Sequence, residues 1–173
     1  MDRRLAGLAA LVLALAVSAA GCTGPAPLAR SSWAFSLVQV DALASQGLTG
    51  AGVTVAVIDT GIDLEHPNLQ GLTLAFWEDL VNGVSTPYDD NGHGTAMASI
   101  LVGRGSLAGG APGATLIVIK AIAADGGGSD ETIATAIADA TSHGADIISL
   151  SLGGAAAKLL RLLGSASVNA AQA

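Results

Sequence analysis

Three short segments of the chain are mainly apolar and rich in β-branched residues. They are Val53–Ile58, in which only Thr54 is polar, Leu116–Ile119, and the stretch that runs from Asp146 to Leu150. A short apolar run without polar alternation is typical of a strand that is buried on both faces of a sheet. We therefore expect three buried strands.

Two segments between these strands have the composition and spacing of helices. Thr95–Val102 contains small and aliphatic residues, and Thr132–His143 is amphipathic. One face of the second segment carries Ile133, Ala136, Ile137 and Ala140. Gly144 follows it, at a position where many helices end in a left-handed residue.

The order of these segments is strand, helix, strand, helix, strand. This order predicts an α/β fold with a doubly wound, mostly parallel sheet in three layers. Ligands of such sheets bind beyond the carboxyl ends of the strands. The polar residues directly after each expected strand are therefore the first candidates for chemistry.

Composition and charge narrow the class of protein. Of the 173 residues, 51% are hydrophobic, 12% are charged and 23 residues are glycine. These values exclude a disordered, highly charged chain, and glycines without a three-residue period exclude collagen. The formal net charge is −7, and a protein of that sign repels phosphate backbones. We therefore expect no nucleic-acid partner.

The first 22 residues have the layout of a secretory signal peptide. The uncharged stretch Leu5–Val17 follows the basic residues Arg3 and Arg4 and leads through small residues to Cys22. This apolar stretch is too short for a permanent membrane span. A buried N-terminal core helix is the alternative.

Two ways of processing this segment remain open. Small residues at Ser18 and Ala20 suit an ordinary signal peptidase, whereas Ala19–Cys22 resembles the lipobox of bacterial lipoproteins. Cys22 is the only cysteine of the chain, which excludes an internal disulfide and a cysteine metal cluster. We expect an extracytoplasmic protein, either secreted or held to the membrane by a lipidated Cys22, with residues 23–32 as a tether.

Two polar side chains stand where the expected fold places ligands. Asp59 closes the first strand, and His93, between two glycines, stands at the opening of the first helix. An acid at the mouth of a buried strand is well placed to orient a histidine. Taken singly, each residue has a structural alternative. Asp59 can cap a helix or turn, and His93 can be an ordinary residue at a helix start.

The sequences around these two residues resemble the aspartate and histidine motifs of the subtilases, the subtilisin-like serine proteases. The two motifs are Val55-Ala-Val-Ile-Asp-Thr-Gly-Ile-Asp63 and Asn91-Gly-His-Gly-Thr95. The resemblance covers residues 33–154 and continues through Gly110-Ala-Pro-Gly-Ala-Thr-Leu116, Ala124-Asp-Gly-Gly-Gly-Ser129 and Ser149-Leu-Ser-Leu-Gly-Gly154. It implies a subtilisin-like fold and a serine endopeptidase.

The resemblance also implies a role for each matching residue. Asp59 would hold the tautomer of His93 and steady its imidazolium. His93 would be the general base toward a serine and then the general acid toward the leaving amine. The substrate, a polypeptide, would lie as an extra β-strand between two backbone segments. These segments are Gly126, Gly127 and Gly128 on one side and Ser151, Leu152 and Gly153 on the other. A flexible turn is the alternative for the glycine segment.

A subtilase also needs a nucleophilic serine, usually in Gly-Thr-Ser-Met-Ala, and an asparagine that donates to the oxyanion. Neither motif occurs in the 173 residues. Ser165 and Ser167 follow the third strand without a nucleophile signature, and Asn169 follows no expected strand. We therefore expect residues 33–173 to be a subtilisin-like domain truncated after about its first half and inactive alone. Its last strand would be an exposed apolar edge.

The resemblance implies no cofactor for this chain. Several subtilases bind calcium through an acid at the position of Asn68, and the segment between Met97 and Pro112 is short for the usual calcium loop. Calcium is therefore an expectation for a full-length protein only. Asp89 and Asp90 are a weak alternative site for an ion.

Three functions follow from these patterns. The leading hypothesis is an exported serine endopeptidase that hydrolyses peptide bonds through a covalent acyl-enzyme. The second is a non-catalytic relative that binds peptides in the retained groove. The third is a metal site made of His66, His93, Asp63, Asp89 and Asp90. The spacing of these five residues is not that of known ligand sets, so we expect no metal.

Overall fold

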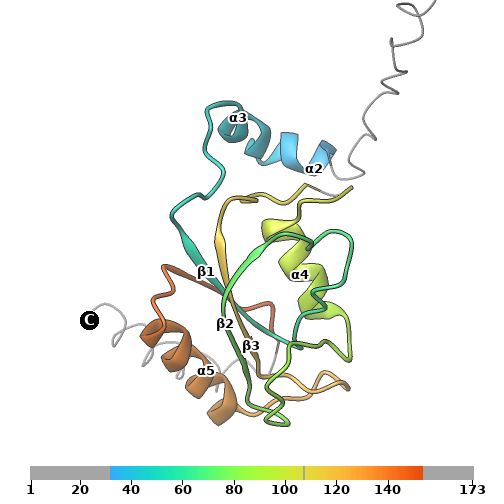
Figure 1. Ribbon diagram of the computed structural model, residues 1–173, viewed down its shortest axis with the longest axis vertical. Helices are drawn as coiled ribbons and strands as arrows, with labels where there is room; N and C mark the ends of the chain where they lie inside the picture. Colours follow the sequence, from blue (N-terminus) through green and yellow to red (C-terminus); the bar gives the residue numbers. More distant parts are fainter. Residues whose placement is uncertain (1–31, 107, 154–173) are drawn as a thin grey trace, which may run out of the picture.

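The computed structural model describes residues 32–106 and 108–153, and it has the expected α/β architecture (Figure 1). Four strands form one sheet in the order β2-β3-β1-β4, and all neighbouring strands are parallel. The strands are β1 (Thr54–Asp59), β2 (Thr73–Asp79), β3 (Thr115–Lys120) and β4 (Ile147–Ser149). The fold class predicted from the apolar segments is confirmed.

Several sequence predictions concern residues that lie outside the described part. These are the signal peptide with Cys22, residues 23–31 of the tether, and the tail that contains Ser165, Ser167 and Asn169.

Two helices cover opposite faces of the sheet, which gives the three layers (Figure 1). They are α4 (His93–Val102) and α5 (Asp130–Ser142). The core on the α5 side contains Ala56, Ile58, Ile117, Ile119, Ile133, Ala136, Ile137 and Ala140. The core on the α4 side contains Val55, Val57, Ile62, Leu69, Ala98, Val102, Leu116 and Val118.

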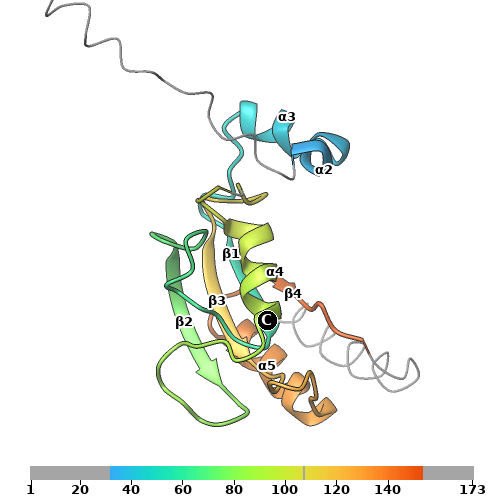
Figure 2. The same ribbon diagram turned by 90° about the vertical axis from the view of Figure 1, so that its right-hand side faces the viewer.

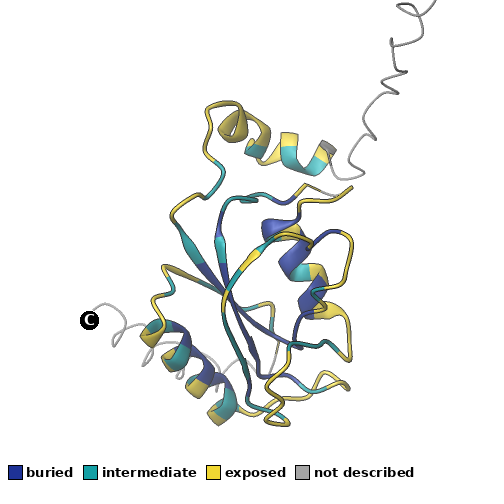
Figure 3. Cartoon of the chain, viewed as in Figure 1, coloured by how far each residue is buried: buried dark blue, intermediate teal, exposed yellow. Residues whose placement is uncertain are grey.

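The two central strands alternate their side chains between these cores. Every residue from Val55 to Asp59 and from Leu116 to Lys120 is buried (Figure 3). Because both faces of the sheet are covered, neither strand needs a polar face. This explains the continuous apolar runs in the sequence.

Helix α5 begins at Asp130 rather than at Thr132, because Ser129 caps it. The Ser129 hydroxyl accepts a hydrogen bond from the Thr132 amide at 3.0 Å, and Asp130 and Glu131 favour the positive end of the helix dipole. Gly144 follows the last turn with φ 81°, as predicted for the residue after a helix.

Helix α4 begins at His93 rather than at Thr95 and ends at Val102 as expected. Strand β4 is shorter than the predicted stretch from Asp146 to Leu150. Within the described residues it pairs only with β1, and Ile147 is 55% exposed. The third predicted strand is therefore an outer strand of the described sheet.

Three elements were not predicted from the sequence. Strand β2 has a register irregularity between Leu74 and Phe76, which interrupts its alternation. Helices α2 (Ser32–Leu37) and α3 (Val40–Ser45) pack against each other, above the amino ends of the strands (Figures 1 and 2). No residue of α3 is buried, so it lacks the apolar face that reveals a helix in a sequence. None of the described helices has the length and hydrophobicity needed to cross a membrane.

Candidate active site

Asp59 is the last residue of the central strand β1 and is only 1% exposed. One carboxylate oxygen, Oδ1, accepts a hydrogen bond from the Thr60 amide at 2.7 Å. The strand's own carbonyl at Asp59 accepts from the amide of Ala121 at 2.9 Å. The sheet and the following turn therefore hold this carboxylate in one position.

His93 is the first residue of α4 and points its ring at Asp59. The Nδ1 atom of His93 lies 2.8 Å from Oδ1 and 3.0 Å from Oδ2 of Asp59. The two residues come from different elements, and the fold brings them together as the sequence predicted. The pair lies at the carboxyl ends of the strands, where open parallel sheets place their ligands.

This contact determines how the imidazole can act. An ionised carboxylate only accepts hydrogen bonds, so Nδ1 of His93 carries the proton and Nε2 keeps its lone pair. The His93 side chain is 45% exposed although its partner Asp59 is buried. Its ring therefore has one edge fixed inside the protein and is accessible to an incoming proton donor.

Asp89 holds the loop that precedes His93. Its two oxygens accept hydrogen bonds from the hydroxyls of Thr60 and Thr95 and from the amides of Asn91, Gly92 and Thr95, at 2.6–3.1 Å. Burial by itself would raise the pKa of Asp89, but these donors, above all the Thr95 hydroxyl, lower it to about 2. Asp89 is therefore an anchor for the start of α4.

Two glycines allow the backbone segments of the site to come close. Gly61, directly after the Asp59 turn, has φ 124°, and a β-carbon there would collide with the carbonyl of Tyr88. A β-carbon at Gly94 would collide with the carbonyl of Gly61. The glycine after each motif residue is thus required by close approach, which places α4 against the end of β1.

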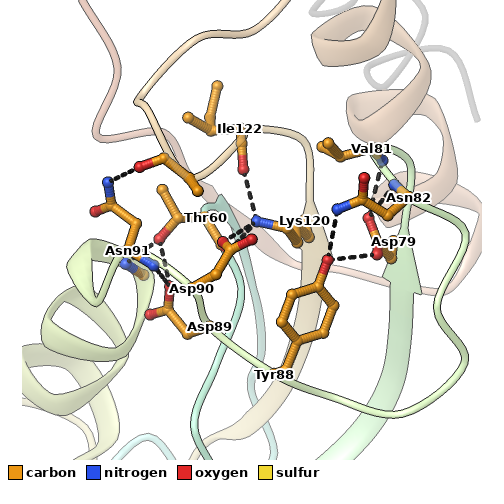
Figure 4. A network of polar contacts seen from close by, with 12 residues as sticks. Thr60, Asp79, Val81, Asn82, Tyr88, Asp89, Asp90, Asn91, Lys120 and Ile122 are labelled. Carbon is orange, nitrogen blue, oxygen red and sulfur yellow. Dashed lines mark hydrogen bonds and ion pairs between the residues drawn. The ribbon is translucent and has the colours of Figure 1, made fainter.

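A buried lysine lies beside this pair of motifs. Lys120, the last residue of β3, is 0% exposed. Its Nζ donates to the carbonyls of Thr60 at 2.7 Å and Ile122 at 2.9 Å, and to the Asp90 carboxylate at 2.7 Å (Figure 4). The Lys120 ammonium also lies 5.2 Å from the centre of the Tyr88 ring. Sequence reasoning missed this residue, although one charged residue at the end of an apolar strand was a visible signal.

The predicted glycine segment follows β3 and is exposed. The carbonyl of Gly127 accepts from the Ala123 amide at 2.8 Å, and the Gly127 amide donates to Asp125 at 2.9 Å, so a tight turn forms. Gly126 has φ 84° in this turn. A β-carbon at Gly128 would press on the Ile122 side chain and the Ala121 carbonyl, just after β3. Within the described residues, the amide and carbonyl of Gly128 make no backbone hydrogen bond.

The second predicted substrate segment follows β4. Ser151 and Gly153 are exposed, and Leu152 packs against the core on the α5 side. Since β3 and β4 flank β1 on its two sides, the two segments leave the sheet on either side of the strand that ends in Asp59. The predicted groove would therefore lie next to the end of β1.

Three of the five residues of the hypothetical metal site have other partners, and one of them, His93, contacts Asp59. Asp89 is surrounded by hydrogen-bond donors, and Asp90 pairs with Lys120. Asp63 and His66 line an open pocket beside α4. In the part of the chain that the structure describes, no three His, Cys, Asp or Glu side chains form a group that could hold a metal.

Comparison with known proteins decides the family. The model of the Subtilase family, Peptidase S8, matches residues 50–172, which is more than half of the chain. The chain belongs to the subtilase family. The resemblance inferred from five sequence motifs is therefore confirmed.

Three relatives show how much of a subtilase the chain represents. Thermitase of Thermoactinomyces vulgaris is 38% identical over 109 residues, which are 61% of this chain and 39% of the relative. Serine protease AprX of Bacillus subtilis is 42% identical over 121 residues, 63% of this chain and 27% of the relative. Subtilisin BL of Lederbergia lenta is 39% identical over 124 residues, 70% of this chain and 45% of the relative. The chain thus spans less than half the length of each of these curated relatives.

In this subtilase the structure brings together Asp59 and His93, the aspartate and the histidine of the two motifs that resemble those of the family. Family membership suggests a serine endopeptidase with polypeptide substrates. No serine hydroxyl within residues 32–153, leaving aside 107, is hydrogen-bonded to His93. Ser165 and Ser167 lie outside the described part.

Proposed function

We propose that this chain is part of a subtilisin-like serine endopeptidase that acts outside the cytoplasm. The observation that carries the proposal is the contact of 2.8 Å between Nδ1 of His93 and the buried carboxylate of Asp59. A histidine oriented in this way, with Nε2 accessible, is a general base for a hydroxyl nucleophile. Its family context supports the same chemistry.

The two residues would act in a fixed order. Nε2 of His93 takes the proton of a serine hydroxyl as its oxygen bonds to the scissile carbonyl carbon. Asp59 stabilises the imidazolium that forms, without taking the proton. The imidazolium then gives its proton to the leaving nitrogen as the C–N bond breaks. Water, deprotonated in the same way, hydrolyses the acyl-enzyme.

The proposed reaction also requires a serine nucleophile and an oxyanion donor. Neither the serine motif nor the asparagine motif of the family occurs in the 173 residues. We infer that the 173-residue chain by itself does not form an acyl-enzyme. Removing triad members from a protease leaves residual catalysis only where the oxyanion hole and substrate binding are intact.

We further propose that substrate lies between the Gly126–Gly128 turn and the Ser151–Gly153 segment. The backbone groups of Gly128 are free for pairing within the described residues, as extended substrate recognition by strand addition requires. The same observation favours a second candidate function, a non-catalytic relative that binds extended peptides in this groove.

Export and anchoring are proposals from the sequence. Leu5–Val17 and the small residues before Cys22 support a signal peptide, and Cys22 is the lipid acceptor that this proposal requires. In a bacterial host, labelled fatty acid should enter the chain, and Cys22→Ala should abolish labelling. Cys22→Ala with unchanged labelling would contradict the anchor.

One experiment separates the candidate functions. The 173-residue chain and the full product of the gene are purified, treated with a fluorophosphonate probe and assayed on a chromogenic peptide. We expect labelling and turnover only for the full product. Turnover that His93→Ala leaves unchanged would overturn the endopeptidase proposal. Binding of extended peptides by both products, without labelling of either, would support the binding relative.

A further inference from the structure

Lys120 is a fully buried cation for which the chemistry described above has no task. It is among the largest side chains that are completely enclosed. Lysine is almost never fully buried unless it is paired, because desolvation of an ammonium is expensive. An apolar residue of similar size would fill the same space without that cost. The ammonium therefore needs an explanation other than packing.

The surroundings of Lys120 match its three N–H groups with three acceptors. These are the carbonyl of Thr60, the carbonyl of Ile122 and the carboxylate of Asp90, at 2.7, 2.9 and 2.7 Å. A lysine ammonium has three donors, so each is used. Asp90, which is 35% exposed at its side chain, supplies the compensating charge.

The three acceptors come from three segments that the proposed reaction needs in fixed relation. Thr60 follows the acid Asp59, and Asp90 lies in the loop that ends at the base His93. Ile122 stands at the start of the stretch that leads to the Gly126–Gly128 turn. Figure 4 shows these three chain segments converging on the Lys120 Nζ atom.

Asn91 makes a second tie between the same segments. Its Nδ2 donates to the carbonyl of Ala124 at 2.8 Å, and its Oδ1 accepts from the His93 amide at 3.2 Å. The loop before His93 is therefore held against the stretch after β3 by two neighbouring residues. Of the two, only Asp90 is held through a buried charge.

We propose that Lys120 is a positioning residue, whose ammonium fixes the His93 loop relative to Asp59 and to the proposed substrate segment. The role rests on the proposed function, because it matters for catalysis only if His93 is the base. It acts entirely through backbone carbonyls and Asp90. Its contribution is geometric, and a displacement of a catalytic group by about 1 Å can lower turnover about a hundredfold.

The test follows the proton that joins His93 to Asp59. The 173-residue chain is labelled with ¹⁵N-histidine, and solvent exchange of the His93 Nδ1 proton is measured by NMR, with Asp59→Asn to assign the signal. In Lys120→Met we expect exchange about tenfold faster, the loss that one charged hydrogen bond of ordinary strength produces. Lys120→Arg keeps the charge but not the compact three-way geometry, and should also accelerate exchange.

Matched variants keep this test decisive. Ile137→Ala destabilises the buried face of α5, away from the Lys120 ammonium, and should leave the exchange rate unchanged in the folded protein. Asp90→Asn, at a half-exposed side chain, should fold even if Lys120→Met does not, and should accelerate exchange. Unchanged exchange in Asp90→Asn, or in folded Lys120→Met, would overturn the proposal, as would full rescue by Lys120→Arg.

The readout also separates this inference from the proposed function. A protected Nδ1 proton in the unsubstituted chain, lost in Lys120→Met, supports the positioning role whether or not any gene product is active. If the unsubstituted chain shows no protected proton, the Asp59–His93 hydrogen bond does not form in solution, and the proposed function loses the observation on which it rests. Where the full product turns over peptide, Lys120→Met should lower kcat about a hundredfold with a smaller change in KM.

Discussion

The central strands β1 and β3 are mainly apolar along their length but end in charged residues. From Val55 to Ile58 and from Leu116 to Ile119 every side chain is apolar and fills one of the two cores. The next residues are Asp59 and Lys120, both buried and paired in register, and β2 ends beside them in the buried Asp79. A row of three buried charges thus crosses the sheet at its carboxyl edge.

Each charge in that row is satisfied in its own way. Asp79 accepts from the amides of Val81, Asn82 and Val84 and from the Tyr88 hydroxyl. Burial opposes ionisation of Asp79, but these four donors outweigh it and lower the pKa. Asp79 therefore fixes the beginning of the loop that ends at His93, much as Asp89 fixes its end.

The difference between the two regions separates stability from function. Apolar burial in the strand bodies contributes free energy of folding with little geometric demand. The charged row must satisfy every donor and acceptor, because a buried charge without partners is destabilising. Substitutions in the strand bodies should therefore lower stability, whereas substitutions at the end of β1 should lower activity.

The largest effect is expected at the end of β1. In a full gene product with peptidase activity, Asp59→Asn should lower kcat about 10⁴-fold, because the amide no longer enforces the tautomer with a free Nε2 on His93. Asp63→Asn, at an exposed acid of the same motif, is the control and should keep activity. If Asp59→Asn lowered kcat by less than about tenfold, Asp59 would not be the aspartate of a catalytic triad.

The strand bodies should respond through stability. Ile117→Ala removes a completely buried side chain from the core on the α5 side. It should lower the free energy of unfolding by about 2–5 kcal/mol, measured by urea titration. Ile100→Ala, which is 48% exposed on α4, should cost less than about 1 kcal/mol. Equal losses at the two positions would mean that the described core does not form in solution.

Sequence reasoning succeeded where the signal is local. The apolar runs of β1 and β3 and the spaced residues of α5 report burial directly, and Asp59 and His93 lie in motifs that the family shares. It failed for β2, whose register irregularity interrupts alternation. It also failed for α3, which buries no residue.

The supporting residues of the site were unpredictable for a different reason. Lys120 contacts Thr60 and Asp90, which are 60 and 30 positions away in the chain. The sequence suggests Asp89 only as an ion ligand, whereas in the structure its oxygens accept from the surrounding amides and hydroxyls. Such partners meet only after the sheet has formed. A local pattern can therefore mark Lys120 as a charge at the end of an apolar strand, but it cannot reveal what the ammonium contacts.

Acid should weaken the anchor of α4 within a defined pH window. The pKa of Asp89 is lowered from 3.8 to about 2, so its contribution to stability is complete above 3.8 and is lost as the pH falls toward 2. Urea midpoints measured from pH 5 to pH 2 should therefore fall. In Asp89→Asn the midpoint should be lower at pH 5, and its decline should be shallower.

A control variant isolates this titration from general acid unfolding. Asp125→Asn changes an exposed carboxylate in the turn after β3. In this variant the urea midpoint should fall with pH as steeply as in the wild-type protein. If the urea midpoint of Asp89→Asn falls as steeply as that of the wild-type chain, the loss of stability in acid comes from other carboxylates, Asp79 first among them.

The smallest effect is expected at Glu78, one residue before the charged row. Its Oε2 atom is buried without a hydrogen-bond partner among the described residues. Burial and the nearby Asp139 on α5 raise the pKa of Glu78 above 4.5, and His143 opposes this only partly. A raised pKa means that the ionised form destabilises the folded state, so stability is lost as the pH rises through that value.

Glu78→Gln should therefore raise the urea midpoint at pH 7, and the advantage should vanish below pH 4.5, where the wild-type carboxyl is protonated. Glu65→Gln, at an exposed position, should leave the urea midpoint unchanged both at pH 7 and below pH 4.5. A midpoint at pH 7 that Glu78→Gln lowers would show that the carboxylate is stabilising. Glu78 would then contribute to stability in its ionised form, as Asp79 does at the carboxyl edge.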